Sequence, residues 1–488
     1  MKSVFRATAL LSGSSAVSIL LSLVSTKVLA MVLHPAGYGY YGLLQSFVAV
    51  GSLVMGMGMA TGLVRLGASS AAEGDLAAMA NLRAGAWLLT GALAVLLIPF
   101  LVVFSLPLSI WALGSAEHQG AVVLMGGALC FAVGVNVQNG FLNAWHKVEA
   151  LASYGIVNTL LNGTVSIVCV CLWHAQGIVP AVLGGTVASW LASRYFLWRH
   201  VPRSSGQTSL RGAIQSARSL LAFGIPFTAS SAVGTGVQLG LPMVVLHLVS
   251  TEGVAYYKAS SAISVGYLGF LVTAMSQDYY PRLSAVRHQP QAMVALIHEQ
   301  YRLVMLLAAP VILVTLALVP FLVPIVYSPR FAPTVEILEW QLIGDLFKFS
   351  SWTMSFAILA RCTPGVYFLT EVLGGAAMLA CTWMGVRMFG LVGLGIGFLA
   401  AYAIYYAIVR TILLREIPAR ETLGNACFML IALAAAVLVR VLPSTPLAGA
   451  RSAVALLLAL GFGLYSARVL WGEYLRERLL RRKPILVS

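Results

Sequence analysis

Apolar runs long enough to cross a membrane follow one another through the whole chain, with polar and charged residues mostly in the short segments between them. A transmembrane α-helix needs about 20 predominantly apolar residues. By this criterion the pattern predicts about fourteen spans, which cover residues 7–33, 40–63, 82–106, 120–143, 152–173, 177–198, 219–248, 254–277, 301–327, 335–360, 365–386, 388–409, 422–442 and 451–471. The first run is longer than the apolar part of a secretory signal and no A-x-A site follows it, so it is counted as a span.

Composition supports this pattern. Of the 488 residues, 60% are hydrophobic and 9% are charged, whereas soluble domains carry about 25% charged residues. A soluble globule, a disordered chain and a disulfide scaffold are therefore excluded. The fold class that we expect is an all-α integral membrane protein.

No feature of the chain predicts an enzyme or a cofactor. No loop is long enough for a soluble catalytic domain, and no GxxxxGK[ST] motif is present to bind a nucleotide phosphate. The six cysteines lie in or beside apolar runs, and Cys169-x-Cys171 lacks the spacing of a zinc or redox pair. We therefore expect neither a cofactor nor a metal site.

The charge balance is strongly basic, with 30 Lys+Arg against 15 Asp+Glu. The basic residues are spread over loops between apolar runs, so they indicate membrane topology and not a nucleic-acid partner. With the N-terminus inside, all basic residues except seven lie on the cytoplasmic side; the seven are Lys27, Lys258, Arg330, Lys348, Arg387, Arg440 and Arg451. This asymmetry predicts that both termini are cytoplasmic and that the number of spans is even.

The chain also contains signs of an internal repeat. The sequence GYGYY at 37–41 opens the second predicted span and GVAYY at 253–257 opens the eighth, while IPFLV at 98–102 and VPFLV at 319–323 lie in the third and ninth. The longest polar segment follows the sixth span and is typical of a linker. A parallel duplication with a cavity between two lobes would explain this order. The predicted domains are an N-lobe at 1–200, a cytoplasmic linker at 201–218, a C-lobe at 219–412, two further helices at 413–472 and a basic cytoplasmic tail at 473–488.

Three segments resemble a known family. LHPAGYG at 33–39 is similar to the LGPxGYG turn of bacterial polysaccharide exporters, although His34 stands where that family usually has Gly, and DYYPRLS at 278–284 resembles their D-Y-Y-P-R-L-S segment. WQLIGDLFK at 340–348 resembles the W-Q-L-x-G-D-x-x-K helix of O-antigen and lipid III flippases. The chain therefore resembles the oligosaccharide-lipid flippases in the polysaccharide-transporter branch of the multidrug/oligosaccharidyl-lipid/polysaccharide superfamily.

The resemblance implies a MATE-like fold, with two pseudo-symmetric six-helix bundles in a V around a central cavity and two extra C-terminal helices. It implies a flippase that moves undecaprenyl-pyrophosphate-linked oligosaccharide from the cytoplasmic to the periplasmic leaflet of the bacterial inner membrane by alternating access. The product would serve O-antigen, lipopolysaccharide or other surface polysaccharide synthesis. The implied partners are the lipid-linked glycan and membrane lipids, with a polysaccharide polymerase and a chain-length regulator as candidate protein partners.

Charged residues inside the spans are candidate substrate-binding residues, because each costs about 2.5–3.5 kcal/mol at a helix centre. Lys27 and Lys258 lie near the periplasmic ends of their spans, where they either face the cavity or snorkel to the surface. Lys348 lies near mid-span with Asp345 three residues earlier on the same face. This pair is either a structural ion pair or a cavity lysine that recruits a lipid pyrophosphate. Gln341 extends the polar stripe by one turn.

Four other residues are candidates. Arg65, at the cytoplasmic end of the second span, is placed to meet substrate headgroups. Asn136 and Asn139 share one face of the fourth span with Asn143, and this face either holds helices together or lines a sugar-binding cavity. Glu371, in the eleventh span, is either a carrier of the coupling ion or a partner of an arginine at a helix end.

Two other functions compete with the flippase. A drug/cation antiporter of the same superfamily should have carboxylates in its cavity, whereas lysines are at least as frequent here. A non-transporting scaffold is disfavoured by the polar stripes and by the prolines inside spans at Pro226, Pro242, Pro310 and Pro320.

Overall fold

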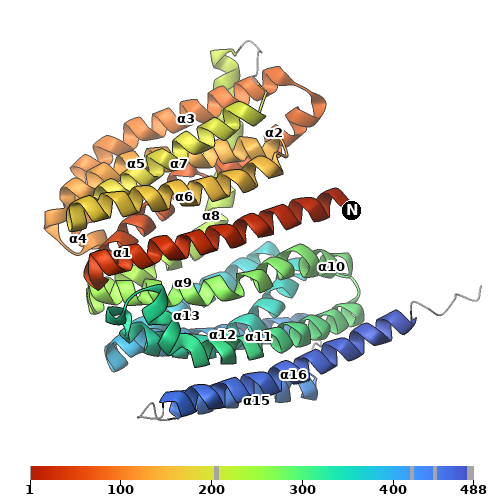
Figure 1. Cartoon of the computed structure of the whole chain (residues 1–488). Coiled ribbons are helices and arrows are strands. Elements are labelled where there is room, and N and C mark those ends of the chain that lie inside the picture. Colours follow the sequence, from red (N-terminus) through yellow and green to blue (C-terminus); the bar gives the residue numbers. More distant parts are fainter. Residues whose placement is uncertain (1, 203–207, 418–421, 443–447, 481–488) are drawn as a thin grey trace, which may run out of the picture. The chain divides into compact units, whose positions relative to one another are not determined.

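The computed structural model describes residues 2–202, 208–417, 422–442 and 448–480, and all regular secondary structure in these ranges is helical (Figure 1). Short 3-10 segments and one π-helical segment, Met275–Tyr279, connect some of the helices. The α-helices are α1 (Lys2–Gly56), α2 (Met59–Glu73), α3 (Leu76–Val103), α4 (Ser105–Leu113), α5 (Gln119–Ala144), α6 (Val148–Trp173), α7 (Ile178–His200), α8 (Leu210–Leu248), α9 (Thr251–Ala274), α10 (Tyr280–Ala285), α11 (Pro290–Val326), α12 (Pro333–Arg361), α13 (Pro364–Phe389), α14 (Gly393–Glu416), α15 (Leu423–Val441) and α16 (Ala448–Leu480).

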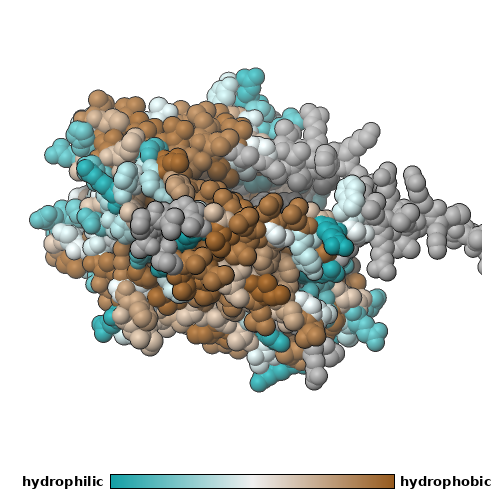
Figure 2. All heavy atoms as spheres, turned by 60° about the horizontal axis from the view of Figure 1, so that its bottom comes forward, coloured by the Kyte–Doolittle hydropathy of each residue, from teal (hydrophilic) through white to brown (hydrophobic). Residues whose placement is uncertain are grey.

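Most of the predicted spans coincide with helices of the structure. Within the described residues, eight stretches are long and apolar enough to cross a bilayer. Val148–His200 and Gly365–Glu416, of 53 and 52 residues, each contain two predicted spans, and Gly13–Gly56, of 44 residues, overlaps the first two. Figure 2 shows one face of the molecule largely covered by apolar side chains, the surface expected of a protein whose solvent is lipid. The chain is a multi-pass, all-α membrane protein, as the sequence predicted.

Two kinks interrupt the first helices. His34, directly before Pro35, has φ 56° and ψ 176° and separates the first two predicted spans within α1. The second predicted span, 40–63, is wrong in its extent because the helix breaks at Met57 and Gly58, which both have positive φ (43° and 65°). Gly58 tolerates the left-handed region because it lacks a Cβ.

Contacts divide the chain into two compact units. The first contains Met1–Lys258 and Ile325–Phe331, and the second contains Ala259–Pro324 and Ala332–Ser488. In the first unit α1 packs against α5 and α6, α7 packs against α5 and α6, and α3 packs against α8. The predicted lobes at 1–200 and 219–412 stay a prediction.

In the second unit α12 packs against α14, and α14 packs against α13. Glycines allow these helices to approach closely: a Cβ on Gly344 would lie 2.8 Å from the Phe398 ring, and one on Gly395 would lie 2.5 Å from the Ile337 carbonyl oxygen. Most of α12 is consequently buried, and its polar residues lie inside protein.

Candidate functional site

The polar stripe of α12 is buried within the second unit. Asp345 is completely buried and Lys348 is 6% exposed, with 3.3 Å between Lys348 Nζ and Asp345 Oδ1. The Ser264 hydroxyl, on α9, donates a hydrogen bond of 2.9 Å to the other carboxylate oxygen, Oδ2. The spacing of three residues brings the two charges together on one helix face, as expected.

Aromatic rings surround the Lys348 ammonium. Its Nζ lies 5.1 Å from the ring centroid of Trp352, 5.7 Å from that of Phe398 and 5.8 Å from that of Tyr402. Such cation–π contacts stabilise a desolvated ammonium. Lys348 therefore has local partners that compensate its burial, and whether it also meets substrate stays a prediction.

Gln341 lies one turn before Asp345 on α12 and is 1% exposed. Neither its amide oxygen nor its amide nitrogen has a hydrogen-bond partner within the part of the chain that the structure describes. A buried amide without partners costs free energy, which makes Gln341 a candidate contact for water or ligand.

Sequence reasoning missed one buried charge cluster. Glu339 on α12 is 1% exposed and pairs with Arg451 of α16 at 2.6 Å and with Arg440 of α15 at 3.0 Å. The cluster joins α12 to both C-terminal helices. The sequence did contain a signal for this cluster. Glu339, Arg440 and Arg451 are all expected on the periplasmic side of the membrane.

Lys258 has different surroundings in the first unit. Its half-buried side chain lies along Gly42 of α1, where a Cβ would be 3.4 Å from Lys258 Cγ. Its ammonium donates a hydrogen bond to the Ser46 hydroxyl. Among the described residues no carboxylate lies within ion-pair distance of it.

The remaining candidates of the first unit have different surroundings. Lys27 is half-buried on α1. Arg65 is exposed on α2, and its guanidinium lies 4.5 Å from the centroid of the Phe223 ring on α8. Asn136 lines a pocket between helices, whereas Asn139 approaches the Tyr154 hydroxyl, so the two amides have different neighbours.

Glu371 lies in a pocket of about 240 Å³ in the second unit. Its Oε1 accepts a hydrogen bond of 2.8 Å from the Tyr405 hydroxyl, which also lies 3.2 Å from Ser355 Oγ. Trp352, Phe356 and Tyr367 complete the pocket. A carboxylate among aromatic rings is a chemically suitable environment for an organic cation or a proton.

No group of three His, Cys, Asp or Glu residues in the described part of the chain could hold a metal ion.

Several solved membrane-protein structures have folds similar to that of this chain. The lipid II flippase MurJ in an inward closed conformation has a TM-score of 0.72 at 14% identity, covering 96% of this chain and 99% of that chain. An inward-facing multidrug-resistance MATE family transporter of the MOP superfamily has a TM-score of 0.67 at 16% identity, covering 82% and 95%. The chain therefore shares its fold with a lipid II flippase and with a transporter of the MOP superfamily.

Sequence comparison places the chain within this class. The lipid III flippase of Escherichia coli (strain K12) is 21% identical over 408 residues, which cover 81% of this chain and 95% of that protein. Residues 28–336, more than half of the chain, match the model of the polysaccharide biosynthesis protein family. The chain belongs to this family, and the resemblance noted in its sequence is confirmed.

Proposed function

We propose that the protein is a flippase that moves an undecaprenyl-pyrophosphate-linked oligosaccharide from the cytoplasmic to the periplasmic leaflet of the inner membrane, for O-antigen or another surface polysaccharide. Family membership supports this proposal, as do the flippases among the similar proteins. A polysaccharide polymerase and a chain-length regulator would act on the product.

The observation that carries the proposal is the environment of Lys258. Its ammonium lies against Ser46 and Gly42 inside the first unit, without a carboxylate within ion-pair distance in the described residues. A cation at bilayer depth is costly when nothing compensates it. A pyrophosphate would supply the missing negative charge, so the site favours an anionic substrate.

The remaining parts of the proposal rest on the charge pattern and the repeat. Both termini are cytoplasmic, two lobes at 1–200 and 219–412 alternate in access, and residues 413–472 add two helices. Lys27 and Arg65 attract the headgroup, while Lys348, Asp345, Gln341, Asn136 and Asn139 contact or support the bound glycan.

The test is flipping in proteoliposomes. A fluorescent undecaprenyl-pyrophosphate-linked sugar is incorporated, and the fraction that an impermeant quencher reaches is followed with time. Lys258→Gln should slow flipping by about tenfold, which corresponds to about 1.4 kcal/mol. Lys147→Gln, at the half-buried start of α6, is the matched control and should leave the rate unchanged. No flipping by the wild-type protein, or equal rates for wild type and Lys258→Gln, would count against the proposal.

One observation favours a second function, a drug/cation antiporter. The pocket of Glu371 combines a carboxylate with aromatic side chains, as cation-binding sites do. In this case the protein should extrude a fluorescent organic cation from loaded vesicles against a proton gradient, and Glu371→Gln should abolish that transport. If Glu371→Gln instead slows only the flipping of lipid-linked sugar, Glu371 carries the coupling ion of the flippase.

A further inference from the structure

An uncharged pocket lies at the break between α1 and α2 in the first unit. Its volume is about 170 Å³, and its polar lining comes from α1, α2, α5 and α8, by way of Ser52, Thr61, Asn136, Thr228 and Ser231. Met59, Val133 and Val137 supply apolar surface. No charged side chain lines this pocket in the described part of the chain.

Three of these polar side chains have unused hydrogen-bonding capacity. The hydroxyls of Thr61 and Thr228 and the amide of Asn136 make no side-chain hydrogen bond within the described ranges. Lipid cannot satisfy such groups, so they need water or a polar ligand. Together they offer donors and acceptors from three different helices to one space.

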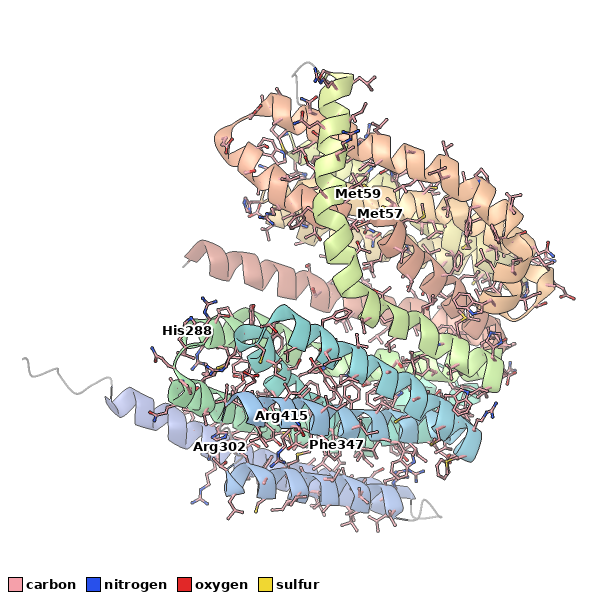
Figure 3. The ribbon with its side chains drawn as sticks, turned by 180° about the vertical axis from the view of Figure 1, so that it is seen from behind. Met57, Met59, His288, Arg302, Phe347 and Arg415 are labelled. Carbon is pink, nitrogen blue, oxygen red and sulfur yellow. The ribbon has the colours of Figure 1, made fainter. Side chains whose placement is uncertain are left out.

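The backbone explains why this space exists. Gly58 has φ +65°, and a Cβ there would lie 2.5 Å from the Gly224 carbonyl oxygen of α8. The two glycines let α8 touch the broken helix directly, and Figure 3 shows Met57 and Met59 beside α8. Thr61 follows Gly58 by three residues and Thr228 follows Gly224 by four, so both hydroxyls lie about one helical turn from the contact.

A cation lies next to this pocket along α2. Arg65 follows Thr61 by four residues and is therefore on the same helix face. Its guanidinium lies over the ring of Phe223, the residue before Gly224. The Cα atom of Arg65 therefore lies about 6 Å along the helix axis from that of Thr61, whose hydroxyl lines the pocket.

We propose that this pocket binds the first sugar of the lipid-linked glycan while Arg65 binds the adjoining pyrophosphate, an inference that rests on the proposed flippase function. The sugar is attached directly to the pyrophosphate, so a cation one turn from an uncharged polar pocket matches the order of groups in the substrate. Sugar hydroxyls both donate and accept hydrogen bonds, and the C–H face of the ring suits the apolar lining. The pocket volume of about 170 Å³ is of the order of the volume of one sugar ring.

The experiment compares two probes on the purified full-length protein in lipid nanodiscs. One probe is undecaprenyl pyrophosphate, and the other is the same lipid carrying one N-acetylglucosamine. We expect the wild type to bind the sugar-bearing lipid about tenfold more tightly. The double variant T61V/T228V should lose this preference to within about twofold while keeping its affinity for the bare lipid, because only hydroxyls are removed.

Matched variants separate the possible outcomes. Arg65→Gln should weaken both probes by a similar factor. Asn136→Leu should act like T61V/T228V and serves as the second variant if the double variant does not fold. Gln119→Leu, exposed on the same helix outside the pocket, should change neither affinity. Equal affinity of the wild type for both lipids, or an equal loss for both in T61V/T228V, overturns the sugar pocket but leaves the flippase standing. Failure of the wild type to bind either lipid overturns both.

Discussion

Lys348 in the second unit and Lys258 in the first are both lysines within apolar helices, yet their surroundings differ. Lys348 is paired with Asp345 at 3.3 Å and surrounded by aromatic rings. Lys258 is half-buried beside a glycine, and its ammonium donates to a neutral hydroxyl, that of Ser46.

The difference concerns where the neutralising charge comes from. For Lys348 the protein supplies the carboxylate, so a substrate anion would have to compete with Asp345. For Lys258 the described residues supply no carboxylate within ion-pair distance. A bound anion would therefore be the negative charge nearest to its ammonium. Residue type and depth alone therefore do not distinguish a stabilising lysine from one that is available to a ligand.

The largest expected effect comes from breaking the buried pair. Asp345→Ala leaves the Lys348 ammonium buried without its carboxylate, and we expect a loss of about 3–5 kcal/mol in the free energy of unfolding. Denaturant unfolding in detergent measures this loss. Asp278→Ala is the control, since the Asp278 side chain is 72% exposed in its ion pair with Arg282 and should cost at most about 1 kcal/mol.

A second change in the same cluster should have a smaller effect. Ser264→Ala removes the 2.9 Å hydrogen bond to Asp345, and a bond to a charged group contributes about 1.5–3 kcal/mol. In a double-mutant cycle with Asp345→Ala the two losses should not add, because they remove the same contact. Additive losses would mean that Ser264 acts independently of the pair.

Lys258→Gln should change stability by less than about 1 kcal/mol, because no ion pair is broken and the amide can still donate to Ser46. Its main effect should be a flipping rate about tenfold lower than that of the wild type. A stability loss as large as that of Asp345→Ala would remove the distinction between the two lysines.

The smallest expected effect is that of Ser46→Ala. It removes a neutral acceptor from Lys258. Because the Lys258 side chain is only half-buried, water can replace the hydroxyl, and the change should cost at most about 1 kcal/mol in stability. The flipping rate should fall by less than about fivefold, since the ammonium remains. A rate below that of Lys258→Gln would show that the hydroxyl itself is required.

Sequence patterns predicted one contact of the structure and missed others for physical reasons. The spacing of Asp345 and Lys348 was informative because both lie on one helix and local geometry alone brings them together. The Glu339 cluster was missed because its arginines come from α15 and α16, and Arg451 is 112 residues away from Glu339. The break at Met57 was missed because it depends on α8 crossing the helix at Gly224.

The sequence by itself determined the fold class. Apolar runs of bilayer length force α-helices, because every backbone polar group in lipid must be satisfied locally, and basic loops predict their orientation. Only the tertiary structure decided which membrane charges are compensated and which polar groups share a pocket. Ser46 and Lys258 are 212 residues apart, and such contacts depend on how helices pack, which the periodicity of a single helix does not encode.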